Sequence, residues 1–437
     1  MLAEGSALFS SLRGQHAKVK PVEVSSDQSL WRVDLHPLGY PADNPRLQLR
    51  RGLQDFNTAD FVSESVVVET FVSEESVPEL QRRDDPNRVR PYRLHAIFLD
   101  AATGKILKTL EWSVDDPNAG IFPRYDGSFL LFTTEHIVLY STDWTPLKEL
   151  PLPQLRAPRS SLAGIAESPS GKVLVIRFHQ DQKTMCIHIL TGTLDSSQYP
   201  CEIPAVFTVS NDEVATAEGG RGSLENIHAA PIIQSIPGPG GTVTQIARGT
   251  GPSENSESMG RVVVRAPKTA AQTICDTNTI SGCEVPQFVN NETIVVYGAF
   301  AFGLVDHKGI SGGTGVTFKT KLNGSVDWID PLGRPVRPSE NGQRFAVLFN
   351  AAQWSRGESS EIKTFVGNVP ASFPNHVDVY DMTKGVWFYT LTNKNNQFTK
   401  IWGLALSPSG EKMAIDSGGV IQMYVVPSAA EIKILGH

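Results

Sequence analysis

The chain has 437 residues and a formal net charge of −7, from 39 basic and 46 acidic residues. This acidic balance excludes a general affinity for the phosphate backbone of nucleic acids, which requires a basic surface, so we expect no nucleic-acid partner. No apolar run approaches the roughly 18 to 20 residues needed to cross a bilayer, so we expect no transmembrane segment. The 37 glycines and 29 prolines are typical of many short strands joined by turns.

Residues 1–54 are predicted to form an arm that carries one edge strand. Met1–Gln28 is polar and shows no periodic pattern. Leu30–Leu35 (LWRVDL) alternates between apolar and polar residues, as a half-buried strand does. We expect this strand to pair with the C-terminal repeat described below, and residues 55–437 to form a single domain.

One unit of short strands and tight turns recurs along the rest of the chain. Its clearest copy is Ile401–Val426, in which the turns Ser407–Gly410 and Gly418-Gly419 separate three apolar strands. Glu431–Leu435 alternates as a fourth strand would. A single four-stranded sheet cannot bury both of its faces, so the pattern requires sister copies elsewhere in the chain.

Six further copies precede this one. Their first turns are Ser63-Glu64, Asp126-Gly127, Ser168–Gly171, Asn211-Asp212, Asn290-Asn291 and Asn341-Gly342. The corresponding sheets are predicted at about Asp60–Trp112, Ala119–Pro153, Ser160–Cys201, Val285–Phe318, Val326–Thr392 and Ile401–Leu435. The fourth sheet begins near Pro204 and leads into the Gly-, Ser- and Pro-rich stretch Gly219–Gly260. About 80 residues separate the fourth and fifth turns, which leaves room for a degenerate eighth copy.

The outer halves of two copies carry a further signature. Asp100–Lys105 (DAATGK) resembles the D-x-x-T-G-K hairpin of YVTN and pyrroloquinoline-quinone-type propeller repeats, and Asp381–Gly385 (DMTKG) is a near copy. From about residue 55 onward the chain therefore resembles β-propellers of the broad YVTN/WD40-like superfamily. The resemblance implies an all-β, seven-bladed β-propeller with four-stranded antiparallel blades, eight blades being the alternative. It implies an architecture and no particular activity.

Three blades carry extra residues at the same position. In blades one, four and six, Glu74–Arg93, Gly219–Gly260 and Ala352–Asn375 follow the second strand and precede the third. In a propeller these connections share a face with the links between blades, and blades one and six are separated only by blade seven. We therefore expect the first and third insertions to meet and form a binding site.

The two insertions are rich in arginine and aromatic residues, which are typical of binding surfaces. The candidate binding residues are Arg82, Arg83, Arg88, Arg90 and Arg93 from the first insertion, and Trp354, Arg356, Phe365 and Phe373 from the second. This mixture favours an anionic or carboxylate-bearing ligand. The alternative is a solvated loop whose charges pair with one another, beside aromatic side chains that cap the blade ends.

No catalytic, metal or cofactor motif can be assembled from the sequence. Gly309–Gly313 matches G-x-S-x-G but lies between predicted strands, whereas the nucleophile elbow requires a strand followed by a helix. The ten histidines show no metal-ligand spacing, and we expect no cofactor. We therefore favour a monomeric, non-catalytic binding or scaffold protein that recognises a protein, peptide or glycan partner. The alternative is a propeller enzyme, such as a hydrolase, lyase or quinoprotein-like protein, with its site at the mouth of the central channel.

Four cysteines fall into two local pairs, Cys186 with Cys201 and Cys275 with Cys283. Short-range pairs are typical of disulfides, so we predict two bridges and a periplasmic or secreted location. Met1–Lys20 lacks the apolar core of a signal peptide. A cytoplasmic protein with four unbridged thiols therefore stays open.

Overall fold

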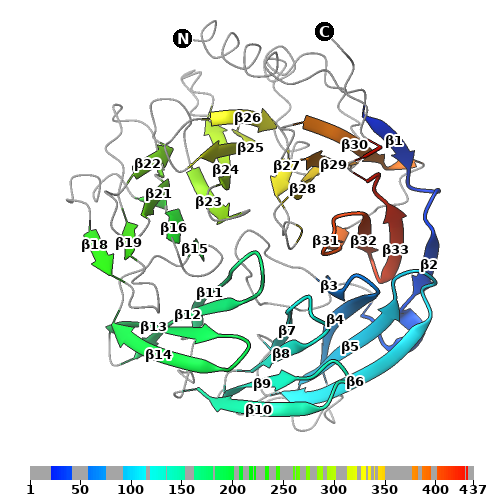
Figure 1. Ribbon diagram of the computed structural model, residues 1–437, viewed down its shortest axis with the longest axis horizontal. Helices are drawn as coiled ribbons and strands as arrows, with labels where there is room; N and C mark the ends of the chain where they lie inside the picture. Colours follow the sequence, from blue (N-terminus) through cyan, green and yellow to red (C-terminus); the bar gives the residue numbers. More distant parts are fainter. Residues whose placement is uncertain are drawn as a thin grey trace, which may run out of the picture.

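Seven sheets follow one another around a ring and form a seven-bladed β-propeller in the computed structural model (Figure 1). The structure describes residues 21–41, 58–74, 92–114, 119–133, 135–152, 162–180, 183–200, 339, 343–349, 376–381, 386–394, 401–428 and 430–431, together with the strands that lie between residues 206 and 335. The expected fold class is confirmed.

Each blade adds its strands in order from the inside of the ring outward. Blade one contains β3 (Ala59–Ser63), β4 (Val66–Glu74), β5 (Tyr92–Asp100) and β6 (Ile106–Val114). Blade two contains β7 (Gly120–Pro123), β8 (Phe129–Phe132), β9 (His136–Tyr140) and β10 (Pro146–Pro151). Blade three contains β11 (Leu162–Glu167), β12 (Val173–Gln180), β13 (Lys183–Leu190) and β14 (Asp195–Pro200).

The remaining blades follow the same order. Blade four contains β15 (Val206–Val209), β16 (Thr216–Gly219), β21 (Val262–Arg265) and β22 (Gln272–Cys275). Blade five contains β23 (Cys283–Phe288), β24 (Thr293–Ala301), β25 (Gly313–Lys321) and β26 (Val326–Asp330). Blade six contains β27 (Gly333–Pro335), β28 (Arg344–Phe349), β29 (His376–Asp381), β30 (Val386–Thr392) and β1 (Val22–Ser25), and blade seven contains β31 (Ile401–Leu406), β32 (Lys412–Ser417), β33 (Val420–Val425) and β2 (Trp31–Asp34).

The predicted boundary between blades five and six is wrong. Val326–Asp330 pairs antiparallel with β25, so it completes blade five, and blade six begins at Gly333 instead of Val326. The long gap after β16 does not supply an eighth blade among the strands that the structure describes. It contains two short pairs, β17 (Arg221–Gly222) with β20 (Met259–Gly260) and β18 (Ile232–Ser235) with β19 (Val243–Ile246).

Burial changes systematically across each blade. In β8 every residue is buried, and in β32 all but the first are, because neighbouring blades cover both faces of an inner strand. The outer strands β6 and β10 are mostly exposed. This gradient explains why the inner strands read as nearly continuous apolar runs in the sequence.

The hydrophobic core is divided into layers between neighbouring blades. Successive residues of a strand point to opposite faces of its sheet, so adjacent residues of β5 serve different layers. Ile97 packs with Met423 in the layer between blades seven and one. Phe98 lies in the layer between blades one and two, with its ring centroid 5.4 Å from that of Phe129. Each blade is therefore stabilised by both of its neighbours.

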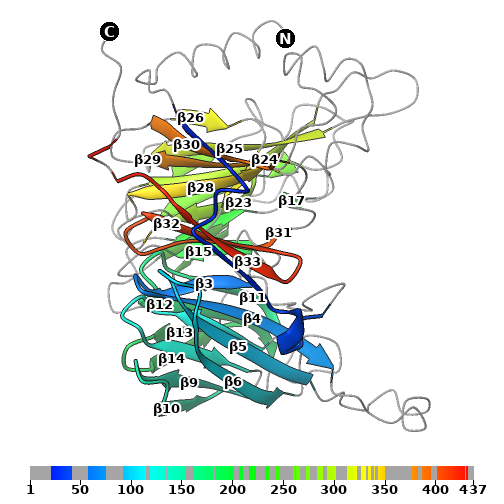
Figure 2. The same ribbon diagram turned by 90° about the vertical axis from the view of Figure 1, so that its right-hand side faces the viewer.

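The N-terminal segment closes the ring, as Figure 2 shows where the blue strands pass β30 and β33. β1 pairs parallel with β30, and β2 pairs antiparallel with β33, where Trp31 lies opposite Met423. The predicted pairing of Leu30–Leu35 with the C-terminal blade is confirmed. The fourth strand of that blade is β2 instead of the predicted Glu431–Leu435, because β2 occupies the outer edge of β33. Residues 432–435 lie outside the described residues.

Trp31 connects this closing segment to blade one. Its indole Nε1–H donates a hydrogen bond of 3.0 Å to the carbonyl of Ala101, in the hairpin between β5 and β6. In that hairpin Asp100 Oδ1 accepts hydrogen bonds from the backbone N–H groups of Ala102 (3.2 Å) and Thr103 (2.8 Å). The D-x-x-T-G-K signature therefore builds the surface that receives the tryptophan.

The described residues contain one helical element, the 3₁₀ turn η1 (His36–Leu38) that follows β2. None of the described helical structure is long and apolar enough to cross a membrane.

The cysteine predictions are not tested by the described residues. Cys186 is buried on β13, where it lies opposite Tyr199 of β14. Cys201 lies outside the described residues, as do the side chains of Cys275 and Cys283 at the ends of β22 and β23. The two disulfides and the location that they imply stay predictions.

Trp31→Ala is expected to lower the free energy of unfolding by about 3 kcal/mol, because it removes a hydrogen bond and the packing of the indole against the core between blades seven and one. The control is Leu30→Ala, whose side chain is 52% exposed and whose loss should cost less than about 0.5 kcal/mol. Both values come from guanidinium unfolding. Equal losses for the two variants would contradict this account of closure.

Gly104→Ala and Gly39→Ala separate backbone strain from the contact with Trp31. Both glycines have positive φ, +72° and +91°, so each alanine pays about 1 kcal/mol for the left-handed conformation. A Cβ at Gly104 would lie 2.8 Å from the indole of Trp31, whereas one at Gly39 meets nothing within 4 Å. Gly104→Ala should therefore cost about 1 to 2 kcal/mol more. This excess should vanish in the Trp31→Ala background.

Candidate functional site: the insertion face around blade seven

The insertion face is the side of the ring on which the second strand of each blade ends and the third begins. In blade one the last pair of this hairpin is Glu74 with Tyr92, and in blade six it is Phe349 with His376. The chain between second and third strands comprises residues 75–91 in blade one, 220–261 in blade four and 350–375 in blade six. The predicted position of all three insertions is confirmed.

The structure describes one of the nine predicted binding residues, Arg93. Arg82, Arg83, Arg88, Arg90, Trp354, Arg356, Phe365 and Phe373 lie outside the described residues. Arg93 is described, and it belongs to the strand β5 instead of the preceding loop. Its Nη1 lies 3.0 Å from Oε2 of Glu111 on β6, so its charge is partly neutralised within the blade.

Blade seven has a tight turn at this position, between the two insertions. Ser417 ends β32, and Gly418 and Gly419 both adopt positive φ, which allows the chain to reverse directly into β33. A Cβ at Gly419 would lie 2.6 Å from the Tyr40 ring and 2.9 Å from the His36 ring. The segment after β2 therefore lies against this turn.

Directly beneath the turn lies Asp416, which is completely buried. Its carboxylate accepts hydrogen bonds from the Tyr40 hydroxyl at 2.5 Å and the Thr58 hydroxyl at 2.7 Å, both to Oδ2. The backbone N–H of Gly419 donates to Oδ1 at 2.9 Å. Three donors from the N-terminal segment, blade one and blade seven thus converge on one carboxylate.

Glu69 on β4 is a second completely buried carboxyl group, on the face of blade one that packs against blade seven. Its carboxyl group interacts with the side chains of Asp416 and Thr58. Burial raises the pKa of Glu69 well above its usual value, and the negative charge of Asp416 raises it further. Burial also raises the pKa of Asp416, although the hydrogen bonds from Tyr40 and Thr58 lower it.

We infer that the two carboxyl groups share a proton, because two buried like charges at close range are strongly disfavoured. Asp416 accepts three hydrogen bonds, so it is the group that ionises more readily. Glu69 therefore retains the proton. Neither residue was a candidate from the sequence, since nothing in the local pattern brings positions 69 and 416 together.

A polar ladder crosses blade one beside this pair, and its members are Ser73, His95, Glu111 and Arg93. The Ser73 hydroxyl lies 2.8 Å from His95 Nε2, and His95 Nδ1 lies 3.3 Å from Glu111 Oε1. The sequence placed His95 in a strand and offered no reason to choose it. The signal lies in the strand register, which sets His95 directly between Phe71 and Glu111.

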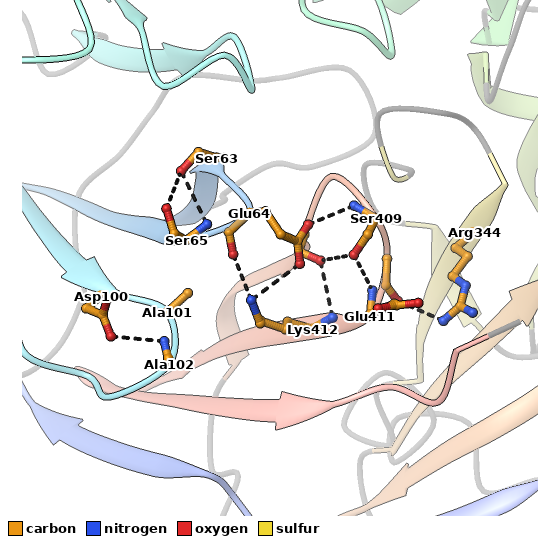
Figure 3. Close-up of polar contacts among 12 residues, drawn as sticks. Ser63, Glu64, Ser65, Asp100, Ala101, Ala102, Arg344, Ser409, Glu411 and Lys412 are labelled. Atoms are coloured by element: carbon orange, nitrogen blue, oxygen red, sulfur yellow. Dashed lines mark hydrogen bonds and ion pairs between the residues drawn. The ribbon is translucent and has the colours of Figure 1, made fainter. Parts of the chain in front are cut away.

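The opposite face of the ring is formed by tight turns that are hydrogen-bonded to one another. In Figure 3 Glu64 of the β3–β4 turn lies between two residues of blade seven. Its Oε2 accepts the backbone N–H of Ser409 at 3.0 Å, and its backbone carbonyl accepts Lys412 Nζ at 2.8 Å. Arg344 of blade six donates from Nη1 to the carbonyl of Gly410 at 3.0 Å. These contacts connect blades six, seven and one.

Within the described part of the chain, no group of three or more histidine, cysteine, aspartate or glutamate side chains is arranged to hold a metal ion.

Comparisons with known proteins find distant structural similarities and no sequence family. No protein-family model and no curated protein sequence matches this chain. Among solved structures, it is similar to the Neurospora crassa Pan2 WD40 domain, with 10% identity, a TM-score of 0.48 and coverage of 94% of this chain and 97% of that one. The β-propeller domain of the trilobed protease from Pyrococcus furiosus matches with 7% identity, a TM-score of 0.44 and coverage of 82% and 90%. Similarity at this level says nothing about activity or partners.

Glu69→Gln is expected to make the protein more stable than the wild type as pH rises. Because the pKa of Glu69 is raised in the folded state, the folded protein binds more protons than the unfolded protein. The contribution of Glu69 to stability is therefore present below its unfolded pKa, about 4.5, and is lost as pH rises through its folded pKa. The amide does not titrate and preserves the shape. The difference in unfolding free energy between the Glu69→Gln variant and wild type should therefore grow from pH 5 to pH 9.

Asp100→Asn is the control for this measurement. The hydrogen bonds of Thr103 lower the pKa of Asp100 in the folded state. The contribution of Asp100 to stability is therefore lost only as pH falls. Its difference from wild type should stay flat between pH 5 and pH 9. A flat difference for Glu69→Gln as well would contradict the shared proton.

Proposed function

We propose that the protein is a β-propeller binding scaffold that recognises a protein, peptide or glycan partner through the insertion face. The observation that supports this proposal is the unequal length of the connections. Residues 75–91, 220–261 and 350–375 begin and end on the insertion face. On the opposite face, every turn of blades one, two, three and seven has five residues or fewer. Binding segments on propellers and other rigid scaffolds are typically such long connections.

The position of blade seven favours a composite site. Its own connection at Ser417–Gly419 is tight, so it places no long segment between those of blades one and six. One ligand that lies over blade seven can therefore contact both segments, residues 75–91 and residues 350–375.

The composition of the two segments favours an anionic or carboxylate-bearing ligand. The first segment contains Arg82, Arg83, Arg88 and Arg90, and the guanidinium group binds carboxylates and phosphates with two parallel hydrogen bonds. The second contains Trp354, Phe365 and Phe373, which supply apolar contact area.

Shortening residues 79–90 to a Gly-Ser turn, and separately Trp354→Ala with Phe373→Ala, should each weaken binding at least tenfold, or about 1.4 kcal/mol. The probe is a fluorescein-labelled polyglutamate peptide, titrated by fluorescence anisotropy. The thermal midpoint should move little, because the changes lie outside the blade sheets.

Lys105→Ala is the matched control, since it removes a cation from the opposite face. Its affinity should equal that of wild type. A wild-type protein that ignores the acidic peptide would contradict the anionic ligand. Binding that survives both changes on the insertion face would contradict the site itself.

A further inference from the structure

Ser73, His95 and Glu111 are aligned on three neighbouring strands of blade one. Ser73 is the penultimate residue of β4, and the insertion 75–91 begins two residues later. Antiparallel pairing sets His95 of β5 directly opposite Glu111 of β6 on the same face of the sheet. The Ser73 hydroxyl thus lies 2.8 Å from His95 Nε2, and His95 Nδ1 lies 3.3 Å from Glu111 Oε1.

The charge of Glu111 determines which way the hydrogen bonds run. Its carboxylate forms an ion pair with Arg93 and can only accept, so the proton of the neutral imidazole lies on Nδ1 of His95. Nε2 is then a lone-pair acceptor, and the Ser73 hydroxyl must donate to it. The same polarity is required when a serine is activated by a general base.

The imidazole is held in place and kept neutral. His95 stacks on Phe71 with ring centroids 4.6 Å apart and an interplanar angle of 13°. Burial lowers the pKa of His95, and Arg93 lowers it too, while Glu111 acts in the opposite direction. A neutral, oriented imidazole is competent to accept a proton at pH 7.

Ser73 lies at the end of β4 that reaches the insertion face. The Ser73 side chain is half-buried there, and the Glu111 side chain is 44% exposed. A ligand on the insertion face would therefore approach the Ser73 hydroxyl from this edge of blade one.

We propose that Ser73 is an acyl-accepting nucleophile, with His95 as its general base and Glu111 as the positioning residue, and that it acts on carboxylic esters presented at the insertion face. Ser73 Oγ forms a bond to the acyl carbon while its proton moves to His95 Nε2. The C–O bond to the leaving alcohol breaks, and the alcohol departs with that proton. Water then loses a proton to His95 Nε2 and attacks the acyl carbon. The bond between the acyl carbon and Ser73 Oγ breaks, Oγ takes that proton back from Nε2, and a carboxylic acid is released.

This proposal goes beyond binding and gives residues to the hydrolase alternative that the sequence left open. The sequence placed that alternative at the channel mouth, whereas the ladder lies on blade one at the interface with blade seven. The proposed binding function does not depend on it, because polyglutamate binding and serine acylation are measured separately.

The test is the rate at which a biotinylated fluorophosphonate labels the full chain, with the site mapped by mass spectrometry. Ser73 should be labelled, and His95→Gln should slow the labelling of Ser73 at least 100-fold. The control is Ser113→Ala, which removes an exposed serine two residues from Glu111 on the same strand and should leave the labelling of Ser73 unchanged.

The labelling rate of Ser73 should rise with pH and then level off. The midpoint of this rise should lie below pH 6.5, the ordinary pKa of histidine. Glu111→Gln should alter this pH profile, which a purely structural contact would not do.

A second pair of variants keeps the test decisive if His95→Gln fails to fold. In Ser73→Cys the thiol would lie beside His95, so iodoacetamide should alkylate position 73 at pH 6 at least tenfold faster than position 113 in Ser113→Cys. Equal rates at the two positions would overturn the proposal. An unlabelled Ser73 in folded wild type, or labelling that is indifferent to His95, would overturn it as well.

Discussion

The pairing of β2 with β33 is the interaction on which the ring depends. Blade seven has only three strands of its own, and without β2 the outer edge of β33 would present unpaired backbone donors and acceptors to solvent. The same segment continues to blade one through Trp31 and begins on blade six through β1. One stretch of about 20 residues therefore connects the last two blades with the first.

Closure and the candidate site are built by the same residues. Tyr40 follows the closing strand, and its hydroxyl helps to hold the Asp416 carboxylate at the interface between blades seven and one. Glu69 faces that carboxylate from blade one. Two ionised carboxylates buried side by side are strongly unfavourable, so this interface becomes less stable as pH rises through the raised pKa of Glu69. Such perturbed groups are common at functional sites, although ion networks that serve the fold also produce them.

Much of the fold could be predicted because turn chemistry is local. Asp126-Gly127 and Ser407–Gly410 each contain a glycine that adopts the left-handed conformation, and each joins the two strands that the sequence suggested. The insertions were located for the same reason, by the strands on either side. What failed depended on pairing between distant segments. Val326–Asp330 reads equally well as the end of one blade or the start of the next, and only its register with β25 decides. The site residues Glu69 and His95 were hidden because a single strand does not reveal its neighbours across a sheet.

The hydrogen bond from the Tyr424 hydroxyl to the carbonyl of Ser26 spans 398 residues of sequence. At about 5 to 20 residues per second of synthesis, the N-terminal segment waits roughly 20 to 80 s for the strand that it must join. Loop closure over this distance also contributes to slow folding. During that interval blade one lacks blade seven, against which it packs, and β2 lacks its partner strand β33. A growing chain of this protein therefore exposes an unpaired strand edge until its last blade is made.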